Sequence, residues 1–208
     1  MTNRGLLVTF EGGDGAGKST LLRALSQRCL ESGRHVLMAR EPGGTALGDA
    51  VRTILLNKQF EEPVDPRAEL LLYLASRAQN AREQIAPALA AGKVVLCDRY
   101  NDSSMAYQGY GRGLPLDEVR ALCSFAVSGV QPRLTFYLDL PPSVGLQRVR
   151  NHATPDRLER EAMEFHDRCR EGFLALAKQE PQRIHVLDAT LKPEDLQEMA
   201  WSLLQPLL

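Results

Sequence analysis

A run of eight residues near the N-terminus has the composition and spacing of a phosphate-binding loop. Residues 12–19 match the pattern GxxxxGK[ST]. Glycines let backbone N–H groups turn inward around an anion, and the N-terminus of the following helix adds a favourable dipole. Lys18 is expected to contact the outer phosphates of a nucleoside triphosphate, and the Ser19 hydroxyl is expected to bind Mg²⁺. The predicted triphosphate site comprises Gly12, Gly13, Asp14, Gly15, Ala16, Gly17, Lys18, Ser19 and Thr20.

Charged side chains that could complete a phosphate site follow other apolar runs. Asp98 ends such a run in the Walker B manner, and it could hold Mg²⁺ directly or through water. Its neighbour Arg99 is a fixed cation of the same predicted cleft, and Arg40 and Arg52 could join it. An arginine fork suits a phosphate monoester because it binds two oxygens at once. For Arg40, an ion pair with Glu41 or another nearby acid is the structural alternative.

Two pairs of side chains have the spacing of neighbours on a helix face. Tyr73 and Arg77 are four residues apart, as are Ser104 and Gln108. A ring that stacks on a base, together with an amide and a guanidinium that read its edge, would form a nucleobase pocket. The alternatives are a core aromatic within a leucine-rich helix for Tyr73 and a solvated turn before Gly109 for Gln108.

A polar, arginine-rich segment has the composition of a lid over the triphosphate. The segment 148–159 contains Arg148, Arg150 and Arg157. A mobile loop of this kind can exclude water and neutralise charge on a phosphoryl group in transfer. With Gly15, the variable positions of the phosphate-binding loop contain no arginine, so a cationic finger must come from elsewhere. The structural alternative is a solvated loop.

The surrounding pattern alternates between short apolar runs and longer helical periodicity. Strands are predicted at 6–10, 35–39, 94–97, 134–138 and 183–187. Helices are predicted at 19–32, 46–56, 67–91, 116–128, 143–149, 158–179 and 193–204. This alternation predicts an α/β fold, a single P-loop NTPase domain over residues 1–208 with a five-stranded parallel sheet and helices on both faces. Ligands should then collect at the carboxyl ends of the strands.

Composition limits the other function classes. The chain has 208 residues and a formal net charge of −1, which disfavours a protein that coats nucleic acid. It has no long apolar segment, and its first residues lack the pattern of a signal peptide, so no membrane partner is expected. The four cysteines form no CxxC pair, which favours reduced thiols in a cytoplasmic protein.

Several motifs taken together resemble the bacterial thymidylate kinases. These motifs are Glu11 with the phosphate-binding loop, residues 40–45 (Arg-Glu-Pro-Gly-Gly-Thr), Asp98-Arg99-Tyr100, Asp102-Ser103-Ser104, residues 106–113 (Ala-Tyr-Gln-Gly-Tyr-Gly-Arg-Gly) and Asp156-Arg157. The resemblance extends over essentially the whole chain, and the order of the motifs makes it specific.

The resemblance implies transfer of the γ-phosphoryl group of ATP to dTMP, giving dTDP, with Mg²⁺ as cofactor and a homodimer as the usual assembly. The lid supplies the arginine finger in this subtype, from Arg148, Arg150 or Arg157. Lys18 and Arg99 are the other implied catalytic residues. The implied acceptor and metal residues are Arg99, Arg40 and Arg52 at the dTMP phosphate, Tyr73 stacked on thymine, Arg77 at O4, Ser104 and Gln108 at the base edge, Tyr107 at the sugar, and Asp14 with Ser19 and Asp98 at the metal.

Three other functions share parts of this pattern. Another nucleoside monophosphate kinase or a deoxynucleoside kinase would share the loop and the lid and differ only in the base pocket. A P-loop GTPase would need a guanine-reading NKxD motif, and residues 57–60 (Asn-Lys-Gln-Phe) lack the Asp. A catalytically inactive nucleotide-binding module is disfavoured because Lys18, Ser19, Asp98 and Arg99 are all present.

Overall fold

Five parallel strands form the centre of the molecule. The computed structural model describes residues 5–56, 60, 63–150 and 156–208. Its strands lie in the order β2-β3-β1-β4-β5, and each pairing between them is parallel. The strands are β1 (Leu6–Gly12), β2 (Val36–Arg40), β3 (Val94–Asp98), β4 (Leu134–Asp139) and β5 (Ile184–Asp188). The predicted five-stranded parallel sheet is therefore confirmed, with strand ends within two residues of those expected.

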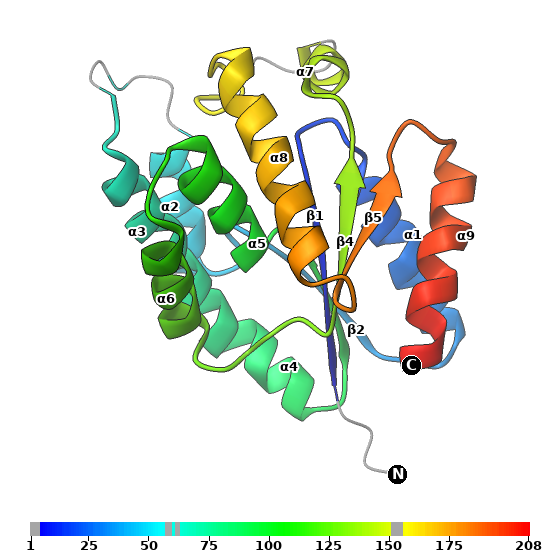
Figure 1. The fold of residues 1–208 in the computed structure, drawn as a ribbon. Coiled ribbons are helices and arrows are strands. Elements are labelled where there is room, and N and C mark those ends of the chain that lie inside the picture. Colours follow the sequence, from blue (N-terminus) through cyan, green and yellow to red (C-terminus); the bar gives the residue numbers. More distant parts are fainter. Residues whose placement is uncertain (1–4, 57–59, 61–62, 151–155) are drawn as a thin grey trace.

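Helices cover both faces of this sheet, as predicted (Figure 1). On one face, α1 (Lys18–Glu31) and α9 (Pro193–Leu204) pack against side chains of β1 and its neighbours. On the other face lie α3 (Pro66–Asn80), α4 (Ala86–Ala90), α6 (Leu116–Val127) and α8 (Met163–Gln179). Every residue of β1 is buried, because a strand at the centre of a doubly covered sheet meets side chains on both sides.

The shorter elements surround the carboxyl ends of the strands or close the chain. These are α2 (Ala46–Leu55), α5 (Asn101–Ser104), the π-helical segment η2 (Met105–Gly111), α7 (Pro142–Arg150) and the 3₁₀ turn η3 (Gln205–Leu207). The helical segment 101–111 was not among the predicted helices. It packs closely against α8, and Gln108 within it is buried and is therefore not in a solvated turn.

The prediction of a single continuous α-helix at 67–91 is wrong in the middle of that range. The backbone widens into a π-helical segment, η1 (Ala81–Ile85), between α3 and α4. Pro87 follows in the first turn of α4. Its ring has no N–H to donate and crowds the preceding turn of a helix, and a π-turn relieves that conflict without ending the helical path.

The helix predicted at 158–179 begins later than expected, at Met163. Asp156 and Glu159 exchange two hydrogen bonds, from the Asp156 N–H to Glu159 Oε2 (2.7 Å) and from the Glu159 N–H to Asp156 Oδ1 (3.0 Å). This reciprocal pair holds a separate turn ahead of α8. Of the predicted lid 148–159, residues 151–155 lie outside the described part of the chain. Among the described residues, no helix is long and apolar enough to cross a membrane.

Candidate active site

The phosphate-binding loop joins β1 to α1 and has the expected geometry. Gly15 and Gly17 have φ values of 75° and 93°, a left-handed backbone that suits glycine. Lys18 is buried and donates to the carbonyl oxygens of Gly12 (3.1 Å) and Gly13 (2.8 Å). Ala16 is buried in the core beneath the loop. This loop lines the larger of the two cavities of the site, which we call the larger cleft. The loop residues that line it are Asp14, Gly15, Gly17, Lys18, Ser19 and Thr20.

Ser19 and Asp98 lie together at the edge of this cleft. Phe10 of β1 is in register with Asp98 of β3, which places the end of β3 beside the start of α1. The Ser19 hydroxyl donates to Asp98 Oδ2 at 2.9 Å. A hydroxyl and a carboxylate are oxygen ligands of the kind that Mg²⁺ prefers, with nucleotide phosphates and waters supplying the rest. Within the described residues no cluster of three or more His, Cys, Asp or Glu could hold a metal by itself.

Arg99 connects the loop to a second pocket. Its φ of 68° turns the chain sharply after β3. The guanidinium donates to Asp14 Oδ1 (2.6 Å), to the Gly12 carbonyl (3.0 Å) and to the Tyr107 hydroxyl (3.4 Å). Burial acts to raise the pKa of Asp14, but the charges of Arg99 and Lys18 more than offset it, so that pKa lies below its usual value. Asp14 is thus an ionised partner of two cations.

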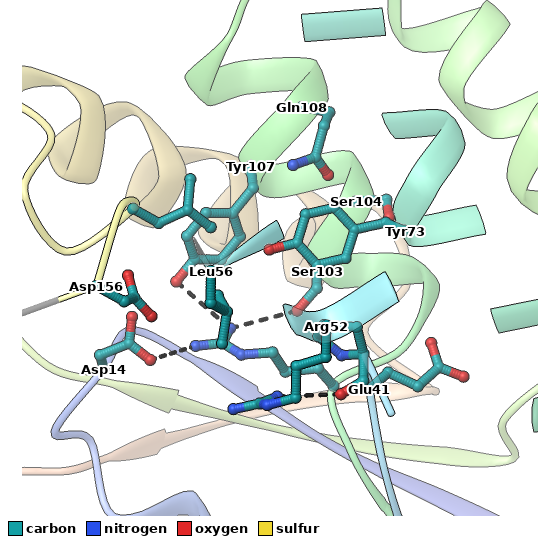
Figure 2. A pocket seen from close by; sticks show the side chains of 13 residues that line it. Asp14, Glu41, Arg52, Leu56, Tyr73, Ser103, Ser104, Tyr107, Gln108 and Asp156 are labelled. Atoms are coloured by element: carbon teal, nitrogen blue, oxygen red, sulfur yellow. Dashed lines mark hydrogen bonds and ion pairs between the residues drawn. The ribbon is translucent and has the colours of Figure 1, made fainter. Parts of the chain in front are cut away.

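The second pocket combines aromatic rings with hydrogen-bonding side chains (Figure 2). Tyr73 from α3 and Tyr107 from η2 face the same space, and Gln108 and Ser104 lie beside them. Tyr107 is fixed from behind by the rings of Phe165 and Phe173, each 6.1 Å away between centroids. Apolar and hydrogen-bonding groups therefore share one cavity, as is typical of small-ligand sites.

Arg77 lies deeper than the base-contacting position predicted for it. Its side chain is 1% exposed and forms an ion pair with Glu41 at 2.5 Å. The same guanidinium donates to Ser104 Oγ at 2.8 Å, which links it to the pocket wall. Burial by itself would lower the pKa of Arg77, but the adjacent Glu41 carboxylate more than offsets this and raises it. A direct contact between Arg77 and a base stays a prediction.

Arg40 and Arg52 both line the larger cleft with the phosphate-binding loop. Arg40 also forms an ion pair with Asp49 at 3.5 Å, and both side chains are more than half exposed. Arg52 donates to the Pro42 carbonyl at 3.0 Å and lines the base pocket as well. Exposed pairs of this kind are weak, so the Asp49 contact leaves the Arg40 guanidinium available for an anion.

The lid arginines have three different environments. Arg148 of α7 donates to the Gly15 carbonyl at 3.2 Å and lines the larger cleft. Arg150 is exposed at the end of α7. Arg157 lies on the other side of the site, where it donates to the Leu55 carbonyl (3.0 Å) and to Glu69 Oε2 (2.6 Å). In this structure, therefore, Arg148 is the lid arginine beside the loop.

Sequence reasoning missed part of the pocket wall and its support. The additional lining residues are Glu41, Pro42, Leu56, Ser103, Asp156 and Leu158. Glu69 was also missed, although it precedes Tyr73 by four residues and so shares the helix face of Tyr73 and Arg77. That spacing was a usable signal, because residues four apart on a helix are neighbours.

Four features together are those of a P-loop kinase. They are the parallel sheet, the phosphate-binding loop after β1, the Ser19–Asp98 pair and the adjoining pocket lined by Tyr73 and Gln108. Comparison with known proteins narrows this class. The family model described as thymidylate kinase matches residues 10–200. The chain belongs to the thymidylate kinase family.

Individual relatives match over nearly their whole length. The thymidylate kinase of Synechococcus sp. (strain JA-2-3B'a(2-13)) is 50% identical over 203 residues, covering 98% of this chain and 96% of the relative. That of Deinococcus radiodurans is 50% identical over 200 residues, covering 96% of each. The crystal structure of thymidylate kinase from Ehrlichia chaffeensis matches with a TM-score of 0.80 and 33% identity, covering 97% of this chain and 99% of that one.

Proposed function

We propose that the protein transfers the γ-phosphoryl group of ATP to dTMP, giving ADP and dTDP. The observation that carries this proposal is the connection of two cavities through shared side chains. Asp14 and Arg99 line both the cleft of the phosphate-binding loop and the pocket of Tyr73 and Gln108. A phosphate held at Arg99 would therefore lie between a triphosphate on one side and its own base on the other.

The acceptor is bound through residues of three kinds. Arg99, Arg40 and Arg52 hold the dTMP phosphate, since guanidinium groups bind phosphate oxygens in pairs. The Tyr73 ring stacks on thymine, and Gln108 contacts the base edge. Ser104 contacts the base edge too, with Arg77 behind it. Tyr107 lies at the sugar, where its hydroxyl, already bonded to Arg99, leaves little room for a 2′-hydroxyl.

The chemistry requires alignment and charge neutralisation rather than a strong base. The acceptor phosphate is already largely ionised at neutral pH. One of its oxygens forms a bond to the γ-phosphorus, while the bond to the β–γ bridging oxygen breaks and its electron pair stays on ADP. Lys18 and backbone N–H groups of the loop hold the outer phosphates, and Arg99 holds the attacking oxygen in line.

Mg²⁺ fits the site through Ser19 and Asp98, whose oxygens are 2.9 Å apart. When bound with ATP, the ion neutralises negative charge on the transferring phosphates. Asp14 as a third metal residue stays a prediction, since its carboxylate is engaged by Arg99 at 2.6 Å. Arg148 is the lid arginine that we assign to the γ-phosphoryl group, because it lies against Gly15.

We also propose a homodimer formed by α3 and α6. These helices pack against each other and expose large apolar side chains, Leu71 (56%), Leu122 (37%) and Phe125 (86%). Exposed apolar side chains gathered on adjoining elements are typical of subunit interfaces. The four cysteines are buried and unpaired, which supports the cytoplasm as the compartment.

A substrate panel tests the reaction. ADP release from ATP is measured with dTMP, dUMP, dCMP, AMP and GMP and with free thymidine, each with Mg²⁺. We expect dTMP to have the highest kcat/KM, with dUMP next, because one methyl group contributes only about 1–3 kcal/mol of discrimination. A preference for AMP or GMP would indicate another monophosphate kinase, and a preference for thymidine would indicate a nucleoside kinase.

A further inference from the structure

A buried carboxylate behind the base pocket holds the side chain that reads the base. Glu69, in the first turn of α3, is fully buried. Its Oε1 accepts from Gln108 Nε2 (2.9 Å) and Arg112 Nε (3.2 Å). Its Oε2 accepts from Arg112 Nη2 (3.0 Å) and Arg157 Nη2 (2.6 Å). Both oxygens are therefore fully engaged by donors on two other segments of the chain, one that contains Gln108 and Arg112 and one that contains Arg157.

This carboxylate is ionised and rigidly held. Burial acts to raise the pKa of Glu69, but the hydrogen bonds from Arg112 and Gln108 and the charges of the two arginines more than offset it. Its pKa therefore lies below the usual value. Arg112 is in turn fixed by Glu161 at 2.7 Å and lies 4.6 Å over the Phe165 ring. Arg112 is thus held by contacts with Glu69, with Glu161 and with Phe165 of α8.

An ionised carboxylate has no proton to donate, and this decides how the Gln108 amide is oriented. A glutamine amide can turn either its NH₂ group or its carbonyl oxygen toward a neighbour, and only the NH₂ group can bond to a carboxylate. The opposite orientation would place two acceptors in contact inside the protein, where unpaired polar groups are costly. Gln108 points toward the space that Tyr73 and Tyr107 also face (Figure 2).

We propose that Glu69 is a positioning residue for base specificity: it holds the Gln108 amide so that Oε1 meets the base, which selects bases carrying an N–H at ring position 3. This inference rests on the proposed function. Thymine and uracil carry a proton on N3 and can donate to that oxygen. Cytosine presents a lone pair at N3 and would need the reversed amide, which the carboxylate of Glu69 forbids.

The substitution Glu69→Gln tests this assignment. A glutamine at position 69 can donate to Gln108 Oε1 or accept from Gln108 Nε2, so it supports both amide orientations. The steady-state kcat/KM is measured for dTMP, dUMP and dCMP in the wild type and in E69Q. We expect the dCMP-to-dTMP ratio to rise about tenfold, the equivalent of about 1.4 kcal/mol. The dUMP-to-dTMP ratio should stay constant, since both bases present N3–H.

Arg112→Gln is the matched control. It removes two of the hydrogen bonds to Glu69 but leaves the bond from Gln108. We expect R112Q to be less stable while its dCMP-to-dTMP ratio stays at the wild-type value. If E69Q does not fold, the double variant E69Q/R112Q, which loses one acid and one base together, is compared with R112Q.

The outcomes separate this inference from the proposed function. An E69Q enzyme whose activity falls equally on all three substrates would show that Glu69 is only structural, and the inference would be wrong. A rise in the dCMP ratio of R112Q equal to that of E69Q would overturn it as well. A wild-type enzyme that does not phosphorylate dTMP would instead overturn the proposed function.

Discussion

Nη2 of Arg99 donates to Oδ1 of Asp14 at 2.6 Å, and this ion pair lies where the phosphate-binding loop meets the base pocket. Arg99 has a left-handed backbone at the end of β3, and Asp14 lies in the loop after β1. The pairing therefore depends on the parallel register of two central strands. It fixes the guanidinium at the boundary between the sites proposed for donor and acceptor.

Arg99→Lys should test whether the fork geometry matters. Lysine keeps the charge, but its three N–H donors share one nitrogen, so it cannot present the planar fork that reaches Asp14 through one nitrogen and a phosphate through the others. We expect kcat/KM for dTMP to fall about 10- to 100-fold, corresponding to one lost charged hydrogen bond, with little change in KM for ATP. Arg28→Lys, at the contact between α1 and α9, is the control. Equal losses in both variants would argue against a role of Arg99 in the site.

Ser19→Ala should weaken the use of Mg²⁺. The hydroxyl that bonds Asp98 is one of the two oxygens that we assign to the ion. We expect the Mg²⁺ concentration for half-maximal activity to rise about tenfold, and EDTA to abolish activity in the wild type. The exposed Ser202→Ala on α9 serves as control. An unchanged Mg²⁺ dependence in S19A would refute this metal site.

The sheet and the phosphate-binding loop were predictable because their signals are local. Apolar runs flanked by glycine and charge give the strands, and the loop pattern fixes the start of α1 by itself. Asp98 could be placed beside Ser19 because the carboxyl ends of parallel strands meet at one edge. The family resemblance added the residues of the acceptor site, whose spacing by itself left Tyr73 and Gln108 ambiguous.

Pairings between distant segments could not be predicted. Arg157 was expected over the phosphates, yet it forms an ion pair with Glu69, which is 88 residues earlier. Arg77 was expected at the base, yet Glu41 at the end of β2 holds it behind Ser104. Such partners depend on how α3 packs against β2 and the segment before α8. No periodicity within one segment contains that information.

Because Glu11 is buried, the free energy of unfolding should decrease as the pH rises. Burial and the nearby Asp102 carboxylate raise the pKa of Glu11 to about 8. Between pH 4.5 and about 8 the folded state keeps a proton that the unfolded state loses, so unfolding is favoured as pH rises. In Glu11→Gln this contribution is absent. We expect the unfolding free energy of the wild type, minus that of E11Q, to fall with pH by at most about 1.4 kcal/mol per unit.

Urea unfolding at pH 5, 6, 7 and 8 measures this difference. Contributions of other titrating groups cancel because both proteins contain them. The Tyr100 N–H and the Ser103 hydroxyl, which bond Glu11 at 2.7 and 2.5 Å, can bond a glutamine as well, so E11Q should fold. A difference that stays constant or grows with pH would show that Glu11 is ionised in the folded protein.

Alanine substitutions of the three lid arginines should rank their contributions to the chemical step. Arg148 lies against Gly15, whereas Arg157 is paired with Glu69 and Arg150 is exposed at the end of α7. We expect R148A to lower kcat about 10³-fold, as loss of an arginine finger does, and the other two to lower it less. Single-turnover rates with saturating ATP and dTMP measure the chemical step. A larger loss in R157A would mean that Arg157 leaves Glu69 and reaches the phosphates.

Phe125→Glu should dissociate the proposed homodimer. The Phe125 side chain is 86% exposed on α6, and α6 packs against α3, which exposes Leu71. Burying one phenylalanine contributes about 1.5–3 kcal/mol, and a two-fold interface contains it twice, so the dissociation constant should rise at least about 100-fold. Sedimentation velocity over a concentration series measures this change. Met199→Glu, which changes an exposed apolar residue on α9 (43%), should leave the dimer intact. A wild-type protein that sediments as a monomer at micromolar concentration would contradict the α3–α6 interface.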